Sequence, residues 1–460
     1  MTAVAVAAAM FMAQLDGTVI HTALPAMGET FGAPPVDLSI GITIYLLAQA
    51  VCLPASAWLA DRFGARRIFA VSVLSFTLTS LLCGLTQTLG QFVAARIFQG
   101  ASAALMTPVG SGLLVRIVGR EKLVHVMTLT STAVLVAPTF GPAIGGFCVT
   151  YLSWPWAFYV NIPVGIVSCL LILRFVPDLA PEAPRPFDLR GFLLAAVAMT
   201  GLLLGLDRIG SPAGTWHVPA ASLLVGAAAA MLLVHHSRSH PAPLLSLAPL
   251  QSGIYRIAVL GGGAAIRIAI RALPFVLPLM FQLGMGMSAF AAGLTLITLN
   301  GADLVIKPLI RRILRRFGYR ANLLATCLAC AAGTAACAAF SPGTPYWVIL
   351  ATLAFLGVAR SILFTGVQTL LYAEIPANRT LSATVLWNVF QQLTSAVGVS
   401  VSAILLNGLA AMHGRWGGTP SLFDFRMVLL FLTVLLALSV ISFRRLAHDA
   451  GAELSGHRSG

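Results

Sequence analysis

The chain has 460 residues, of which 58% are hydrophobic and only 9% are charged, and its mean hydropathy is +0.92. A soluble fold has too little interior to bury so many apolar side chains, so the composition excludes a soluble protein and predicts an all-α polytopic membrane protein. The net charge of +14 does not predict nucleic-acid binding, because the basic residues lie in short loops between apolar runs.

The apolar runs have the length of transmembrane helices, which need about 20 residues to cross a hydrocarbon core of roughly 30 Å. They predict 14 spans, near residues 2–25, 38–60, 68–87, 90–114, 125–151, 156–176, 188–208, 218–236, 253–281, 287–311, 320–341, 345–371, 382–410 and 426–445. Nearly all the loop arginines then fall on one side, which predicts that both termini are cytoplasmic. The abundance of alanine and the scarcity of lysine are typical of a GC-rich bacterial genome, so we expect a multi-pass protein of the bacterial inner (cytoplasmic) membrane.

A short charged loop occurs twice, as residues 60–67 (ADRFGARR) and again as residues 315–320 (RRFGYR). A proline-rich linker, residues 177–186, and a second polar segment near residue 240 bracket spans 7 and 8. With that pair set aside, each charged loop follows the second span of a six-span half, and such repeats are typical of secondary transporters. We therefore predict four parts: an N-terminal six-helix bundle (1–180), an inserted transmembrane helix pair with its linkers (181–245), a C-terminal six-helix bundle (246–446) and a cytoplasmic tail (447–460).

Five motifs follow one another along the first half of the chain. They are Leu15-Asp16-Gly17-Thr18 with Ala23-Leu24-Pro25 in span 1, Asp61, Arg62, Gly64, Arg66 and Arg67 in the first charged loop, Arg96, Gln99 and Gly100 in span 4, Gly141-Pro142-Ala143-Ile144-Gly145-Gly146 in span 5, and residues 154–165 at the start of span 6. In this order they resemble the fourteen-span drug/proton antiporters of the major facilitator superfamily, the EmrB/QacA type. The chain departs from that pattern at His21, where the family usually has asparagine, and at Ala57, where it usually has glycine.

This resemblance implies a major facilitator fold of two six-helix bundles plus an inserted helix pair, 14 transmembrane helices in all. It also implies multidrug efflux, in which hydrophobic or amphipathic small molecules leave by alternating access in exchange for protons. The partners would be the substrate, protons and the lipid bilayer, and the proton gradient would be the energy source, with no cofactor. The resemblance makes the first charged loop a conformational latch and the glycine-rich segment of span 5 an antiporter motif.

Asp16 lies halfway along span 1, where a carboxylate is costly unless it is paired, hydrated or protonated. A carboxylate poised between burial and a nearby cation can bind and release a proton, so Asp16 is the predicted proton-coupling residue. Arg96 is its predicted partner, because a guanidinium stays charged. Two alternatives stay open: Asp16 is a permanent structural ion pair, or Arg96 only extends toward the membrane interface.

The glycines of span 5 offer a small surface against which another helix can pack closely, and this packing could have no bearing on transport direction. In the first charged loop, Gly64 permits a tight turn and Asp61 can cap a helix or pair with an arginine. The loop charges could equally serve orientation in the membrane alone.

The second half places charged residues inside predicted spans. Arg267 and Arg271 share one helix face, as do Asp303 and Lys307, because each pair is spaced i, i+4. Asp303 and Lys307 could be a self-contained ion pair, or Asp303 could titrate while the arginines contact substrate. The candidate cavity residues are His21, Gln99, Arg267, Arg271, Asp303, Asn388 and Gln392. The arginines favour an alternative function, namely a dedicated exporter of an anionic or zwitterionic metabolite.

Three histidines, His235, His236 and His240, lie near the predicted cytoplasmic surface without a neighbouring cysteine or carboxylate in the sequence, so no metal site is predicted. The chain has no GxxxxGK[ST] phosphate loop and neither of the hydrolase motifs HExxH and GxSxG, so neither ATP as the energy source nor an enzyme is indicated. A non-transporting membrane receptor or an integral membrane enzyme is the remaining alternative class. A periplasmic adaptor is compatible with the sequence but nothing in it identifies one.

Overall fold

A computed structural model of the chain describes residues 1–118, 120–178, 186–209, 216–376, 379–413 and 418–447. Within these residues the secondary structure is helical and contains no strand. The same residues include 14 helical segments that are long and apolar enough to cross a membrane. The predicted all-α class and number of spans are therefore confirmed.

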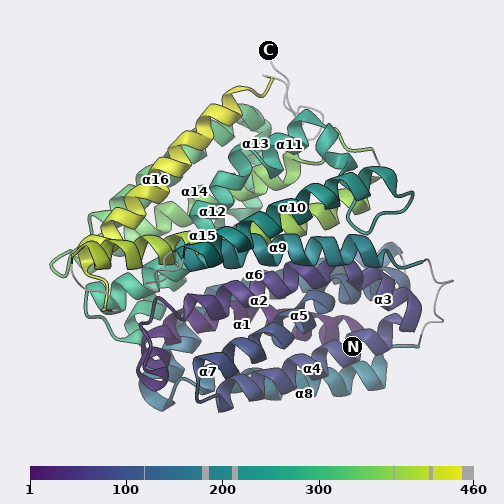
Figure 1. Cartoon of the computed structure of the whole chain (residues 1–460), viewed down its shortest axis with the longest axis horizontal. Helices are drawn as coiled ribbons and strands as arrows, with labels where there is room; N and C mark the ends of the chain where they lie inside the picture. The colour runs from purple at the N-terminus through teal and green to yellow at the C-terminus, as the bar shows by residue number, and fades with distance from the viewer. Residues whose placement is uncertain (119, 179–185, 210–215, 377–378, 414–417, 448–460) are drawn as a thin grey trace. The chain divides into compact units, whose positions relative to one another are not determined.

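The chain divides into two compact units. Unit 1 comprises Met1–Leu245 and Ser288–Gly293, and unit 2 comprises Ser246–Met287 and Leu294–Gly460. Unit 1 contains α1 (Thr2–Phe31), α2 (Ser39–Cys52), α3 (Ser56–Phe63), α4 (Ala65–Leu85), α5 (Leu89–Ile117), α6 (Arg120–Phe147), α7 (Trp156–Tyr159), α8 (Asn161–Phe175), α9 (Leu189–Ile209), α10 (His217–Ser239) and the first residues of α13 (Figure 1). Unit 2 contains α11 (Gly253–Val259), α12 (Gly262–Leu279), the rest of α13 (Ala289–Ala338), α14 (Tyr346–Leu370), α15 (Thr380–Met412) and α16 (Leu422–Arg444).

The packing places the predicted inserted pair, α9 and α10, in unit 1. The boundaries of the four predicted parts stay a prediction, and residues 448–460 of the predicted tail lie outside the described residues.

The first span is longer than predicted. The sequence suggested an end at Pro25, but α1 continues to Phe31 and stops at Gly32, whose φ of 62° is left-handed. A proline inside a transmembrane helix removes one hydrogen bond and kinks the helix without ending it, whereas a glycine in the left-handed conformation closes the last turn.

The two charged loops share one backbone feature. Gly64 separates α3 from α4 with φ 89°, and Gly318 interrupts α13 with φ 70°. An L-residue at such a φ costs roughly 1–2 kcal/mol, so glycine is the residue that permits both turns. Gly318 therefore divides α13 into two spans, Ala289–Phe317 and Tyr319–Ala338, as the repeat predicts.

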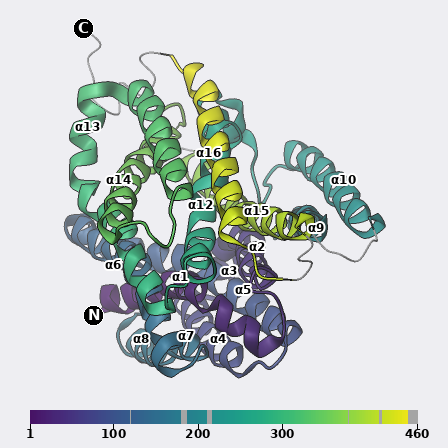
Figure 2. The same ribbon diagram turned by 90° about the vertical axis from the view of Figure 1, so that its left-hand side faces the viewer.

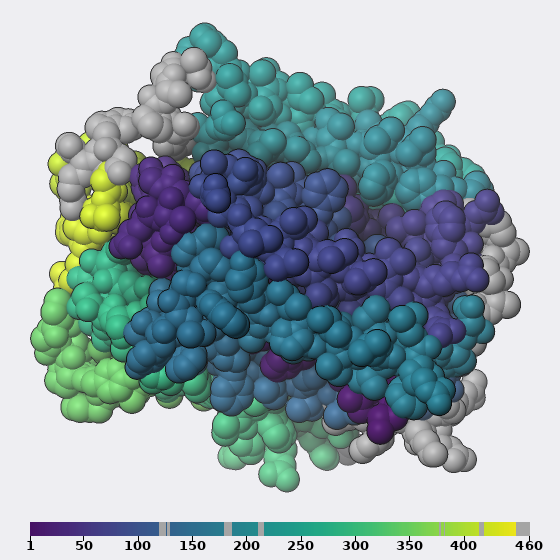
Figure 3. Space-filling model, turned by 90° about the horizontal axis from the view of Figure 1, so that it is seen from below, coloured from purple at the N-terminus to yellow at the C-terminus, as the bar shows by residue number. Residues whose placement is uncertain are grey.

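In unit 1, α1 packs against α5, α6 and α8, and α4 packs against α5 and α8. Figure 3 shows the face on which side chains of α4 and α8 lie side by side. Beneath them is an apolar core that includes Met10, Phe69, Phe76, Leu113 and Ile172. This core fixes the helices that carry the polar residues of the candidate site.

The helices α9 and α10 lie side by side (Figure 2) and pack through small residues. A Cβ at Gly201 would lie 2.8 Å from the Cα of Gly226 on the other helix. Such close approach is the usual way in which membrane helices associate, because lipid offers no hydrophobic driving force between them. The pair also packs against α2 through α9.

Candidate functional site

The carboxylate of Asp16 is the centre of a buried polar network in unit 1. Its side chain is 1% exposed, and its Oδ2 pairs with Nη1 of Arg96 at 2.7 Å. Its Oδ1 accepts hydrogen bonds from Nε2 of Gln99 at 2.9 Å and from Nδ2 of Asn161 at 3.0 Å. Three helices, α1, α5 and α8, thus meet at one carboxylate. The contact between Asp16 and Arg96, which the sequence left open, is present.

The guanidinium of Arg96 is fully buried and held on several sides. Besides Asp16, it donates to Oε1 of Gln99 at 2.6 Å and to the carbonyl of Gly41 at 3.3 Å. Its Cζ lies 4.0 Å from the centre of the Tyr45 ring, a cation–π distance. Arg96 therefore points into the helix bundle and pairs with Asp16. The alternative interpretation, in which it only extends toward the membrane interface, does not hold in this structure.

Two members of this network were not among the predicted site residues. Asn161 begins α8, and Ser80 on α4 accepts a hydrogen bond from Nε2 of Gln99 at 2.8 Å. The motif at the start of span 6 contained Asn161, but nothing in the sequence connected it with Asp16. Gln99 was predicted to line the substrate cavity, but in this structure its side chain belongs to the buried network around Asp16. The Gln99 side chain is fully buried, and its amide group hydrogen-bonds to Asp16, Arg96 and Ser80.

The predicted latch residues contact other residues of unit 1: Asp61 with Arg116, Arg66 with the carbonyl of Leu173, and Arg67 with Asp178. The Asp61–Arg116 pair is 2.9 Å long and both side chains are about one-third exposed, at 31% and 37%. Arg62 is exposed at the surface. Exposed pairs of this kind contribute about 0–1 kcal/mol, so they are easily exchanged for other partners.

The glycines of the predicted antiporter motif lie against α1 next to Asp16. A Cβ at Gly141 would overlap Thr18, and one at Gly145 would overlap the backbone carbonyl of Val19. Gly146 lies equally close to Ala289, in the part of α13 that belongs to unit 1. Pro142 lies within α6. The motif therefore lets α6 approach the segment of α1 that carries the buried carboxylate.

Substitution of Gly145 by alanine is expected to destabilise unit 1 by about 1–3 kcal/mol, because a backbone carbonyl cannot move aside for the new methyl group. The matched control is Gly112→Ala in α5, where a Cβ meets no atom within 4 Å. Alanine there should be neutral or stabilising by up to about 1 kcal/mol. Thermal unfolding of the purified variants in detergent measures both, and equal midpoints for the two variants would contradict the close-packing interpretation.

A second charged cluster lies in unit 2. Asp303 on α13 pairs with Arg360 of α14 at 2.9 Å and with Lys307 at 3.3 Å. Arg360 also donates to Asn300 at 2.9 Å, and Ser361 donates to the backbone carbonyl of Asp303. The predicted Asp303–Lys307 pair is therefore present, but it is part of a larger cluster that joins two helices.

Arg267 does not face a cavity. Its side chain is 1% exposed and donates to Thr394 and to the carbonyls of Ala258 and Val259 at the end of α11. Its Cζ lies 4.6 Å from the centre of the Trp387 ring. Carbonyls at a helix end lack intrahelical partners, so Arg267 caps α11 and holds it to α15. Its prediction as a cavity residue therefore needs correction.

The other predicted cavity residues occupy varied positions. Arg271 is exposed and lies over the Phe364 ring at 5.3 Å, whereas Asn388 and Gln392 on α15 are half-buried. His21 on α1 is 6% exposed, and its Nδ1 has no hydrogen-bond partner among the described residues. Of this set, Arg271 is the residue that is exposed.

Comparison with known proteins decides the family. The sequence profile of the Major Facilitator Superfamily matches residues 6–399 and 259–457. The chain belongs to the Major Facilitator Superfamily. A Salmonella typhimurium protein provisionally named multidrug resistance protein MdtD is 36% identical to this chain over 446 residues. The alignment covers 96% of this chain and 94% of the Salmonella protein. The resemblance inferred from the motifs is thereby confirmed.

Solved structures of two other transporters have a similar fold. The POT family transporter PepTSo matches with a TM-score of 0.69 over 99% of both chains, at 12% identity. A D-xylose-proton symporter matches with a TM-score of 0.65 over 94% of this chain and 96% of that one, at 15% identity. The family profile, the Salmonella relative and the 14 apolar helices together make this member of the Major Facilitator Superfamily a multi-pass membrane transporter and not an enzyme.

Proposed function

We propose that this transporter exports hydrophobic or amphipathic small molecules in exchange for protons, by alternating access, in a bacterial cytoplasmic membrane with both termini inside. The observation that carries the proposal is the buried Asp16–Arg96 pair, which puts a titratable carboxylate at membrane depth in the first half of the transporter. The multidrug-resistance name of the Salmonella relative supports the substrate class.

In this conformation the Asp16 carboxylate is ion-paired and accepts two amide hydrogen bonds, as a deprotonated carboxylate does. Coupling requires a second conformation in which Asp16 separates from Arg96, meets water and takes up a proton. A proton on Asp16 removes the attraction to Arg96, so protonation and separation favour each other. Because α1, α5 and α8 all supply groups to the network, a shift of α1 against the other two would break it.

The exposed ion pairs of the first charged loop suit a latch. Asp61 and Arg116 join the ends of α3 and α5 with little net stabilisation. A contact this weak can be broken and remade during each cycle without trapping either conformation. The buried Asp16–Arg96 pair would then respond to the proton, while the loop responds to the movement of the helices.

The test is to reconstitute the purified protein in liposomes under an imposed pH gradient and to record internal pH after adding hydrophobic cations and other amphipathic dyes. We expect proton movement that depends on the added substrate and stops when a protonophore collapses the gradient. Substrate movement without proton movement would contradict antiport.

The exposed residue Arg271 favours one second candidate, a dedicated exporter of an anionic metabolite. Loss of a charge-assisted hydrogen bond costs about 2 kcal/mol, or roughly thirtyfold in apparent affinity. In the same assay, Arg271→Gln should weaken transport of anions by about that factor, and Arg271→Lys should restore most of it. A panel in which many uncharged and cationic scaffolds are carried, and Arg271→Gln has no effect, excludes this candidate.

A further inference from the structure

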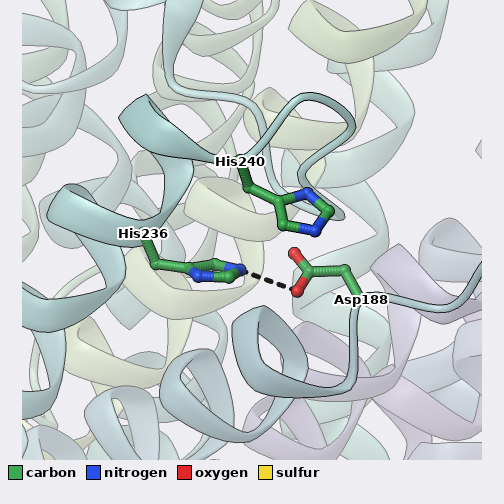
Figure 4. A group of neighbouring side chains, drawn as sticks. All are labelled: Asp188, His236 and His240. Carbon is green, nitrogen blue, oxygen red and sulfur yellow. Dashed lines mark hydrogen bonds and ion pairs between the residues drawn. The ribbon is translucent and has the colours of Figure 1, made fainter.

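Three side chains of types that can bind a metal ion lie together at one end of the helix pair, within unit 1. Asp188 directly precedes α9, His236 lies in the last turn of α10, and His240 follows that helix (Figure 4). One potential ligand atom from each lies within 4.8 Å of the other two. Sequence analysis singled out His236 and His240 but predicted no metal site, because Asp188 is 48 residues away from His236 along the chain.

The carboxylate of Asp188 is buried and held in place. Its side chain is 4% exposed. Its Oδ1 accepts the N–H of Gly191 at 2.9 Å, and its Oδ2 accepts the N–H of Leu244 at 3.1 Å. Burial acts to raise the pKa of this carboxyl, but the hydrogen bonds from Gly191, Leu244 and His236 outweigh it, so its pKa lies below the usual value. Asp188 is thus a deprotonated acceptor with its orientation fixed by backbone groups, as ligating carboxylates commonly are.

The two imidazoles lie beside this carboxylate. Nε2 of His236 is 2.7 Å from Oδ1 of Asp188, and the two ring centres are 5.0 Å apart. His240 is half-buried, and its Nδ1 accepts the N–H of Ala242 at 3.2 Å. The His236 ring therefore contacts the carboxylate, whereas the ligand atom of His240 lies within 4.8 Å of it. The described hydrogen bond of the His240 ring is the long one from Ala242.

We propose that Asp188, His236 and His240 bind one divalent transition-metal ion of the zinc class, with water in the remaining position. Imidazole nitrogens and a carboxylate oxygen are ligands that Zn²⁺ takes at about 2.0–2.2 Å, which places tetrahedral donor atoms about 3.3 Å apart. To reach that spacing, the distance between Nε2 of His236 and Oδ1 of Asp188 increases from 2.7 Å by about half an ångström. The largest of the three ligand–ligand distances, at most 4.8 Å, decreases when the side chains rotate. The ion replaces the His236–Asp188 hydrogen bond and the long contact to Ala242.

A bound ion would crosslink the start of α9 to the end of α10, the first and last parts of the inserted pair along the chain. The ion joins the residue before α9 to the last turn of α10 and to the loop that leads to α11. Leu244, which already donates to Asp188, and Ser237, which donates to the carbonyl of Leu245 at 2.8 Å, anchor the same loop. The inference does not depend on what the transporter carries or on its coupling ion.

The experiment measures zinc binding to the full-length protein in detergent, purified with an affinity tag that contains no histidine, by isothermal titration calorimetry. The test variant is His240→Ala, because His240 can be removed while Asp188 keeps its bonds to Gly191, Leu244 and His236. The control is His235→Ala, an exposed neighbouring histidine outside the cluster. We expect one ion per wild-type chain, at least tenfold weaker binding in His240→Ala, and unchanged binding in His235→Ala.

Two further readouts keep the outcome clear. Co²⁺ in place of Zn²⁺ should give the visible absorption of a four-coordinate site in the wild type and in His235→Ala but not in His240→Ala. Zinc should raise the midpoint of thermal unfolding in the same two proteins alone. Absence of zinc binding by the wild type, or equal weakening in both variants, would overturn the proposal and leave the cluster as a hydrogen-bonded clamp.

Discussion

Replacement of Asp16 by asparagine is expected to abolish substrate-evoked proton movement in liposomes, to the level of liposomes without protein. Asparagine has nearly the size of aspartate but cannot gain and lose a proton near neutral pH. Because Asp16 is 1% exposed and paired with Arg96 at 2.7 Å, a carboxylate elsewhere cannot take over its position. The measurement is the reconstituted pH assay, with the amount of folded protein in the membrane matched to the wild type.

The matched control is Asp303→Asn, which removes an arginine-paired carboxylate in a span of unit 2. Asp303 is 25% exposed and keeps Lys307 and Arg360 as neighbours, so it resembles Asp16 in chemistry but lies in unit 2. This variant should retain substrate-evoked proton movement. Loss of coupling in Asp303→Asn together with its retention in Asp16→Asn would place the coupling carboxylate in unit 2 and make Asp16 a structural ion pair.

The spans and turns were predictable because local sequence determines them. Fourteen runs of sufficient length and apolarity gave the helices. Two Phe-Gly pairs among arginines marked turns at Gly64 and Gly318, where the backbone adopts a positive φ. The end of α1 was misplaced because the apolar run predicts the membrane-crossing part of the helix, whereas α1 continues past Pro25, which a membrane helix can accommodate.

The site was only partly predictable, because its geometry depends on contacts between distant segments. A charged residue inside a membrane span is unusual, so Asp16 and Arg96 could each be recognised from the sequence. Their contact could not be predicted, because the two residues are 80 positions apart along the chain. Gln99, from the span 4 motif, and Arg267, from its i, i+4 spacing with Arg271, were predicted to line a cavity, since a polar residue in a span must face something polar. The structure satisfies both with buried hydrogen bonds, which periodicity cannot distinguish from a water-filled cavity.

The second prediction separates the structural role of the buried pair from its coupling role. Arg96→Gln alone should destabilise the protein by about 3–5 kcal/mol, because it leaves the Asp16 carboxylate buried without its cation. Asp16→Asn alone should cost a comparable amount, since it leaves the guanidinium of Arg96 buried without its anion. Both effects are measured by thermal unfolding of the purified variants in detergent.

The double variant, Asp16→Asn with Arg96→Gln, should lie within about 1 kcal/mol of the wild type, because two neutral amides can hydrogen-bond to each other and to Asn161. It should nevertheless show no substrate-evoked proton movement, since the carboxylate that would carry the proton is absent. This double-mutant cycle isolates the energy of the pair from that of each side chain. If the destabilisations of the two single variants simply add, the charges do not stabilise each other. A stable double variant that lacks coupling would show that α1 and α5 pack together without the Asp16–Arg96 ion pair. The free-energy cost of burying these two charges in the membrane would then serve proton transfer and not stability.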